Sequence, residues 1–290
     1  MLGFINQIKR IGHVMAKGVT VHFLGELNGL AEELLHKLVL NNDKSSIDKQ
    51  SHARVTSKIS TELEFVDNAP QVFHESKVQS NDITLLFDFN NDGLVNKSLN
   101  TIKGSKIIIT DRENLPSRSN EEHKIILVRD MIHYTAEFNQ NNQLDRLYSH
   151  CVSGKPIESV VDEKHWWVSQ QDVASCLYRL IGSPESIPSF LHICGRRGWS
   201  LSETFDQLKI LFERTIAGAT GQFNTTSLEQ KPVITQTLTK LSDTINSSRP
   251  DLSPLDDALQ VIDGQRWRPI VPLRTSLMHY LAMKDFSHSV

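Results

Sequence analysis

The chain has 290 residues, a formal net charge of −3 and 39% apolar residues, a composition typical of folded globular domains. Its near-neutral charge excludes a general electrostatic attraction to nucleic acid or to an anionic membrane surface. No apolar run approaches the roughly 20 residues that span a bilayer, and no signal-peptide pattern opens the chain. We therefore expect a cytoplasmic protein with no nucleic-acid partner and no membrane span.

Residues 1–17 place Leu2, Ile5, Ile8 and Ile11 at helical spacing, with basic residues between them. This pattern predicts a short amphipathic N-terminal helix or extension. Such a helix either packs on its own domain or docks on a membrane surface or a partner. Its few positive charges favour packing on its own domain, because a short helix of this kind binds lipid weakly.

The next segment predicts a strand, a glycine turn and a helix. Residues 18–24 are rich in β-branched side chains, Gly25 and Gly29 follow them, and residues 30–40 repeat leucines on one face. Residues 41–62 are polar and predict a surface segment, with at most a short strand at residues 53–55.

Continuous apolar runs predict four more strands. They cover residues 62–66, 83–87, 106–110 and 124–128. Such runs are typical of strands buried on both faces of a parallel sheet, with helices such as residues 94–102 between them. The first half of the chain therefore predicts an α/β fold with a doubly wound parallel sheet.

The second half is richer in helix. Helical spacing predicts helices over residues 143–152, 170–181, 202–217 and 273–283, and short strands are expected at residues 166–168 and 190–193. The cysteines Cys151, Cys176 and Cys194 are widely spaced and lack a C-x-x-C motif, so we expect reduced thiols and no metal site.

Several short motifs from residue 125 onward occur in a recognisable order. They cover residues 125–129, 134, 154–157, 165–174, 191–195, 200–203 and 267–269. This order resembles the extended short-chain dehydrogenase/reductases, the NAD-dependent epimerase/dehydratase family. The resemblance implies a Rossmann-like dinucleotide-binding core over residues 18–135. It also implies a smaller C-terminal α/β substrate lobe, whose elements lie mainly within residues 136–290 and are interleaved with the core.

The resemblance implies NAD or NADP as cofactor, bound at a G-x-x-G-x-x-G turn. Gly25, Asn28 and Ala31 occupy the three glycine positions here. Asparagine tolerates a positive φ and alanine is nearly as small as glycine, but Asn28 places a side chain where the phosphates would lie. The turn either binds a dinucleotide or serves the fold alone.

Two further sites follow from the resemblance. Asp67, after the strand predicted at residues 62–66, resembles an acid that contacts the adenine, although Asp67-Asn68 also suits a simple turn. Arg54 and Lys58 are either ligands of a ribose phosphate or solvated surface residues.

The family's reaction uses a Tyr and a Lys four residues apart, on a helix that would lie between residues 106–110 and 124–128. The intervening residues 111–123 contain neither a Tyr nor a Lys. We therefore expect the catalytic helix to be missing. Tyr280 and Lys284 have the right spacing, but they lie on the last predicted helix, so we interpret their spacing as accidental.

Only weak catalytic candidates remain. Thr110 could replace the family's Ser or Thr hydroxyl, and His133 and Tyr134 fall where cofactor and substrate pockets meet in the family. His133 is either a base near pH 7 or a hydrogen-bonded surface residue. Arg196 and Arg197, with nearby tryptophans, either clamp a nucleotide or are solvated beside a packed core.

Three functions are consistent with the sequence. The first is a degenerate, non-catalytic epimerase/dehydratase-like protein that binds a nucleotide or NAD(P) and acts as a binding, regulatory or scaffolding subunit. The second is an active NAD(P)-dependent epimerase, dehydratase or reductase of a nucleotide sugar. The third is an interaction protein that pairs with a second copy or with a homologous enzyme subunit.

Overall fold

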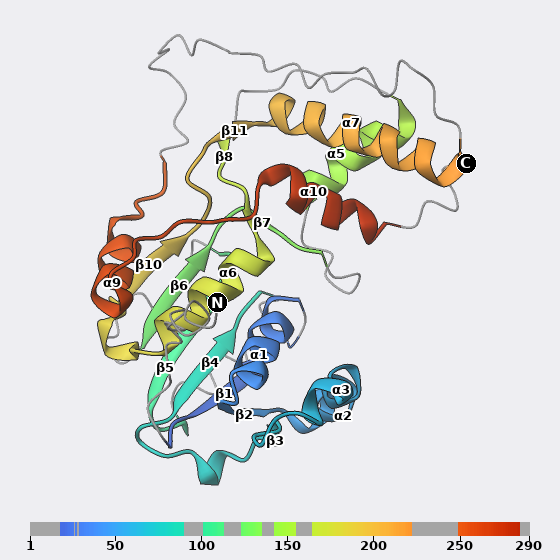
Figure 1. Cartoon of the computed structure of the whole chain (residues 1–290). Helices are drawn as coiled ribbons and strands as arrows, with labels where there is room; N and C mark the ends of the chain where they lie inside the picture. The colour runs from blue at the N-terminus through green and yellow to red at the C-terminus, as the bar shows by residue number, and fades with distance from the viewer. Residues whose placement is uncertain are drawn as a thin grey trace, which may run out of the picture.

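The computed structural model describes residues 18–25, 27, 29–89, 101–112, 123–134, 142–154, 164–221 and 249–284. The helix predicted within residues 1–17, Asn28 and most of the helix predicted at residues 94–102 lie outside these ranges. The chain folds into a sheet flanked by helices, with a smaller helical lobe at one end (Figure 1).

The core is a sheet of seven parallel strands in the order β3-β2-β1-β4-β5-β6-β10. Their bounds are β1 (Thr20–Gly25), β2 (Lys44–Ile47), β3 (Gln71–Val72), β4 (Ile83–Phe87), β5 (Ser105–Thr110), β6 (Lys124–Val128) and β10 (Phe190–Ile193). The strand order runs outward in both directions from β1, so the fold is the predicted Rossmann-like, doubly wound sheet.

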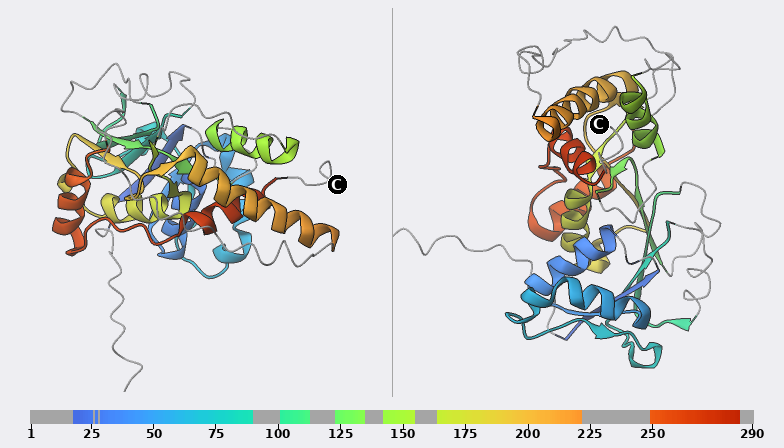
Figure 2. Two further views of the ribbon diagram at one scale, coloured as in Figure 1. Left: turned by 90° about the horizontal axis from the view of Figure 1, so that it is seen from above. Right: turned by 90° about the vertical axis from the view of Figure 1, so that its right-hand side faces the viewer.

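Helices α1 (Leu30–Leu40), α6 (Gln170–Ile181) and α9 (Ser253–Asp263) pack on one face of this sheet (Figure 2). The leucines that predicted α1 are buried against the same cluster as the inward-facing residues of β1, β4 and β5. On the opposite face, Leu86, Ile108 and Ile125 form a smaller apolar cluster. Burial of both faces explains why these strands read as continuous apolar runs.

The smaller lobe contains α5 (Asn142–Ser153), α7 (Leu201–Thr220) and α10 (Leu273–Ala282), which share a second apolar cluster. Two strand pairs join the lobe to the sheet, and they are β7 (Met131–Ile132) with β9 (Val168–Ser169) and β8 (Lys164–His165) with β11 (Trp199–Ser200). The chain enters the lobe after β6, returns for α6 and β10, leaves again for α7, and returns for α9 before it ends in α10. The two parts are therefore interleaved in sequence.

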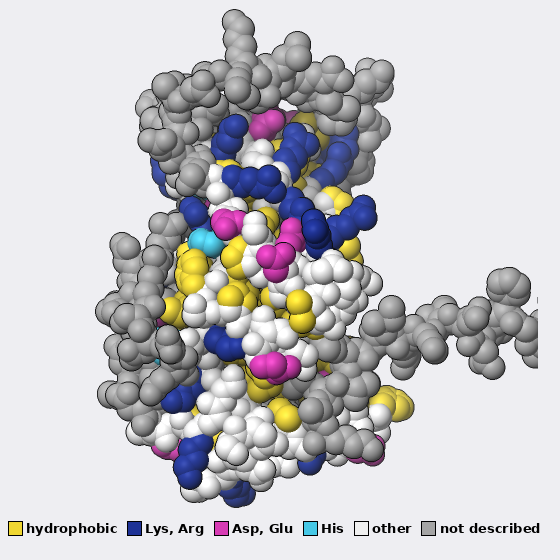
Figure 3. Space-filling model, turned by 90° about the vertical axis from the view of Figure 1, so that its left-hand side faces the viewer, with side chains coloured by type: hydrophobic (Ala, Val, Ile, Leu, Met, Phe, Trp, Pro, Cys, Tyr) yellow, Lys and Arg dark blue, Asp and Glu magenta, His cyan; other side chains and the backbone are white. Residues whose placement is uncertain are grey.

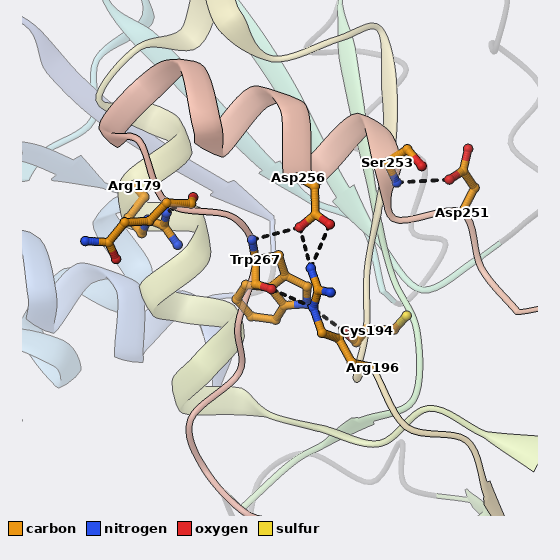
Figure 4. A network of polar contacts seen from close by, with 8 residues as sticks. Arg179, Cys194, Arg196, Asp251, Ser253, Asp256 and Trp267 are labelled. Atoms are coloured by element: carbon orange, nitrogen blue, oxygen red, sulfur yellow. Dashed lines mark hydrogen bonds and ion pairs between the residues drawn. The ribbon is translucent and has the colours of Figure 1, made fainter.

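A strap of residues 265–272 connects α9 to α10 and is held by a compact polar network (Figure 4). Arg196 binds both carboxylate oxygens of Asp256 at 2.6 and 2.7 Å and donates to the Trp267 carbonyl at 2.6 Å. The Trp267 backbone N–H donates to Asp256 and its indole N–H donates to the Cys194 carbonyl, both at 2.8 Å. Arg196 Nη2 thus contacts both oxygens of Asp256, and charge-assisted bonds of this kind are shorter and stronger than neutral ones.

The structure corrects the prediction for residues 41–66. The strand expected at 62–66 is wrong: residues 60–63 form the short helix α3 (Ser60–Leu63), and Phe65 is 83% exposed. The strand expected at 53–55 lies inside α2 (Lys49–Lys58), whose first turn is capped by Asp48, which accepts from the Ser51 N–H at 2.9 Å. Residues 44–47 of this polar segment instead form β2. Pairing with β1 on one side and β3 on the other outweighs the weak strand propensity of these residues.

Gly25 offers a direct test of the β1–β4 contact. Its φ is +92°, and a Cβ there would lie 2.2 Å from the Phe87 carbonyl oxygen, so Gly25→Ala should lower the free energy of unfolding by about 3 kcal/mol or more. Gly18 shares a positive φ of +98° but has open space around it, so Gly18→Ala should cost about 1 kcal/mol. Urea unfolding measures both, and equal losses would contradict the steric argument.

Candidate functional site

Open parallel sheets bind ligands beyond the carboxyl ends of their strands, where the strand order reverses. In this chain that point lies between β1 and β4. Gly25 ends β1 there, Gly29 precedes α1 with φ +52°, and Ala31 is fully buried. Gly25 is required by the Phe87 carbonyl whether or not a ligand binds. Two of the predicted cofactor residues, Gly25 and Ala31, therefore lie at this turn, but packing alone accounts for both.

The amino end of α1 already carries negative charge. Glu32 and Glu33 lie in its first turn, where carboxylates stabilise a helix in the same way as a bound anion would. Arg54 donates to Glu32 at 2.5 Å and to the Leu27 carbonyl at 2.9 Å, and Lys58 binds Glu32 at 3.1 Å. Arg54 and Lys58 thus offset the charge of Glu32, so both cations are already paired within the protein.

The structure does not bring Asp67 to the turn. Asp67 is exposed, and its carboxylate accepts from the Asn42 amide at 3.2 Å. Asn42 precedes β2, so this contact lies at the amino edge of the sheet, opposite Gly25. The acid at the carboxyl edge is Asp48, the first residue after β2. Sequence reasoning missed Asp48 because it missed the strand.

Asp88 and Thr110 lie at the carboxyl ends of β4 and β5, and Arg112 binds the Asp88 carboxylate across them. The buried Thr110 hydroxyl donates to the Asp88 carbonyl at 2.8 Å and accepts from the Arg112 backbone N–H at 3.2 Å. Burial and the nearby Asp88 raise the pKa of the neighbouring Asp111. The Thr110 hydroxyl is therefore engaged in holding this edge together.

His133 is buried beyond the end of β7, with the Phe89 ring edge-on at 6.5 Å. Burial lowers the pKa of His133 to about 4, because an imidazolium ion loses hydration there. At neutral pH the ring is uncharged. Burial makes the surface interpretation of His133 wrong, and a pKa of about 4 does not fit a base near pH 7 either.

Tyr134 packs against the His279 ring of α10 at 5.3 Å and lies within electrostatic range of Glu33 on α1 and Asp172 on α6. Burial raises the pKa of Tyr134, and the carboxylates of Glu33 and Asp172 raise it further. A catalytic phenol needs the opposite shift, because it must lose its proton near neutral pH.

The pair with Tyr-x-x-x-Lys spacing is joined through a carboxylate. The Tyr280 hydroxyl and the Lys284 ammonium both bind Asp145 Oδ1, at 2.6 and 2.7 Å. Burial and Asp145 raise the pKa of Tyr280. The pair lies beside the α5–α7–α10 cluster of the lobe. It is away from the switch point, the place between β1 and β4 where the strand order reverses.

The sequence has four tyrosines, and the structure describes all of them, Tyr134, Tyr148, Tyr178 and Tyr280. None lies between β5 and β6 in the sequence. Burial together with carboxylates raises the pKa of Tyr134, Tyr178 and Tyr280.

Beyond the end of β6 lies a pair that sequence reasoning missed. Asp130 has φ +51°, accepts from the Trp166 N–H at 2.7 Å and contacts His165 Nδ1 at 3.0 Å. The His165 ring stacks on Trp167 at 4.8 Å, and its Nε2 atom is buried with no hydrogen-bond partner among the described residues. A carboxylate orients this histidine as one orients a general base, and the buried Nε2 atom would have to become accessible to act as one. Residues so far apart in sequence give no spacing signal.

Metal and thiol chemistry find no support in the described part of the chain. No group of three or more His, Cys, Asp or Glu side chains there could hold a metal ion. Burial raises the pKa of all three cysteines, which keeps them as thiols at neutral pH. Among the described helices, none is long and apolar enough to cross a membrane.

No protein-family model and no curated protein matches the chain in sequence. Solved structures do resemble it. The terminal R domain of the myxalamid biosynthetic pathway gives a TM-score of 0.52 at 12% identity, covering 94% of this chain and 92% of that one. UDP-N-acetylglucosamine 4-epimerase from Bacillus cereus gives a TM-score of 0.52 at 10% identity, and the match covers 92% of this chain and 100% of the epimerase. A nucleoside-diphosphate-sugar epimerase from Staphylococcus aureus gives a TM-score of 0.52 at 11% identity, and the match covers 90% of this chain and 100% of that epimerase. The chain therefore shares the fold of these solved structures.

His133 predicts a pH dependence of stability. Its pKa is about 4 in the folded protein and about 6.5 in the unfolded chain, so only the unfolded chain takes up a proton between these values. The folded state should lose about 3 kcal/mol of stability as the pH falls from 6.5 to 4. Urea unfolding across this range should show a flatter profile for His133→Gln, whereas His74→Gln, at an exposed site, should follow the wild type. Identical profiles for all three proteins would contradict the assignment.

Proposed function

We propose that this protein is a non-catalytic relative of the sugar-nucleotide epimerases and dehydratases, which binds a nucleotide or NAD(P) and works as a binding, regulatory or scaffolding subunit. One observation carries the proposal. All four tyrosines are placed, none precedes β6 as the family's catalytic Tyr would, and the pKa of three of them is raised. Each unit of such a shift costs about 1.4 kcal/mol in forming the phenolate.

The charges beside the end of β1 set how strongly a nucleotide would bind there. Glu32 and Glu33 occupy the helix end that would face a pyrophosphate, and Asp88 lies at the end of β4. These carboxylates weaken the attraction for phosphate, whereas Arg112 offsets the charge of Asp88. We infer that a nucleotide binds here more weakly than at an uncluttered glycine-rich turn.

A second candidate function rests on the Asp130–His165 pair. If His165 Nε2 accepts a proton from a sugar hydroxyl, an NAD(P)-dependent epimerase, dehydratase or reductase could work without the family's tyrosine. In that case, the base would come from β8 (Lys164–His165).

Calorimetry with NAD, NADH, NADP and NADPH tests the proposal. We expect micromolar binding of at least one of them, and no turnover of UDP-, GDP- or dTDP-linked sugars. Arg112→Met leaves Asp88 uncompensated and should weaken binding about tenfold, because an unpaired carboxylate repels phosphate. Arg146→Met, at an exposed site on α5, should leave binding unchanged.

Two outcomes contradict the proposal. Absence of binding would refute the nucleotide site and leave the fold as a scaffold. Turnover of a nucleotide sugar would refute the non-catalytic role, and its loss in His165→Gln would establish the second candidate. Gly25 variants are unsuitable here because they disturb the contact between β1 and β4.

A further inference from the structure

Cationic side chains gather on the side of the molecule that carries the end of β10 and the strap (Figure 3). We define the basic band as five exposed residues, Lys164, Arg197, Arg249, Arg266 and Arg268. They come from β8, the turn after β10, the segment before α9 and the strap.

Contacts between neighbouring residues make the band continuous. A Cβ at Gly198 would lie 3.5 Å from the Lys164 side chain, which places Lys164 beside the turn that carries Arg197. Arg196, the preceding residue of this turn, donates to the carbonyl of Trp267, between Arg266 and Arg268. The charge of Arg249 acts on Cys194, whose carbonyl binds the same Trp267.

The acidic side chains around the band are already engaged. Asp256 is held by Arg196 and the Trp267 N–H, and Asp263 is held by Arg179 at 2.6 Å. Glu203 caps α7 through the Ser200 N–H at 2.9 Å and is 3.7 Å from Arg197. Arg266 and Arg268, in contrast, make no hydrogen bond or ion pair with any described residue. Asp251, which accepts from the Ser253 N–H at 2.9 Å, and Asp257 remain as exposed acids, fewer than the five cations of the band.

The strap presents these arginines in alternation. Trp267 points inward, and Arg266 and Arg268 are exposed on either side of it. Ile270, two residues further on, has a side chain that is 79% exposed, although its N–H is anchored to Asp172 at 3.0 Å. Residues two apart in an extended chain repeat about every 7 Å on one side. The strap therefore offers two guanidinium groups and an apolar side chain in a row on a rigidly held backbone.

We propose that the basic band is the docking surface for an extended acidic segment of a partner protein, with carboxylates at alternate positions meeting Arg266 and Arg268. Each guanidinium can bind a carboxylate in a bidentate manner, and Ile270 gives the segment an apolar contact. Nucleic acid fits less well, because a long polyanion would meet the negative charge of the remaining surface, as the net charge of −3 indicates. The inference does not depend on nucleotide binding at the switch point.

Fluorescence anisotropy tests the proposal on the full chain. The probe is a fluorescein-labelled peptide with glutamate at alternate positions, compared with the same peptide carrying glutamine and with a single-stranded oligonucleotide of equal charge. The glutamate peptide should bind, and the glutamine peptide should not. Arg266→Ser with Arg268→Ser should weaken binding at least about tenfold. Lys77→Ser with Lys103→Ser, exposed near the amino edge of the sheet, removes the same charge and should change it less than about twofold.

Three results would overturn the proposal. They are no binding of the glutamate peptide at low salt, equal losses in the two double variants, and tighter binding of the oligonucleotide through the same arginines. Circular dichroism should show unchanged folding of both variants, since all four side chains are exposed. If the glutamate peptide binds but none of the four dinucleotides does, only the proposal of nucleotide binding is refuted. The two proposals can therefore fail separately.

Discussion

The buried carboxylate of Asp172 holds together the parts of the chain that cross between sheet and lobe. It accepts from the Ser169 hydroxyl at 2.9 Å and from the backbone N–H groups of Ile270 and Val271, both at 3.0 Å. These donors come from the end of β9 and from the strap that leads to α10. A charged acceptor with three donors offsets the cost of its burial, and it satisfies two partly buried strap N–H groups. Asp172 thus ties the strap to the start of α6, at the junction of sheet and lobe.

The sequence predicted the elements whose own residues determine them. The strands β4, β5 and β6 are apolar because both of their faces are covered, and the leucine spacing of α1 reflects its one buried face. The strand β2 reads Lys-Ser-Ser-Ile and carries no such signal. Its strand state comes from neighbours on both sides, which are fixed only when the chain is folded. Asp67 was assigned to the cofactor site because a strand was expected at residues 62–66. No strand forms there, and this local error placed the acid at the wrong edge of the sheet.

The sequence offered positions for a candidate site but not their chemistry. Gly25 and Thr110 were chosen from their places at the ends of predicted strands, and His133 and Tyr134 from the order of motifs. What each side chain does depends on partners distant in sequence, such as Asp88 for Thr110 and Glu33 for Tyr134. Shifts in pKa arise from burial and from charges across the fold, and no spacing rule encodes them. The pair of Asp130 and His165 is invisible in the sequence for the same reason.

A glycine at the first turn of such a sheet is weak evidence for a cofactor. Gly25 would be needed here even with no ligand, because the Phe87 carbonyl leaves no room for a Cβ. The charged residues discriminate better, since they contribute little to packing and determine which ligand charge is tolerated. At α1 the carboxylates take the place of an anion, whereas the strap keeps arginines that no described residue neutralises. The carboxyl edge of the sheet beside α1 thus carries carboxylates, and the strap carries the arginines. On this argument, the surface of the strap is a better guide to what this chain recognises than the turn that its fold would suggest.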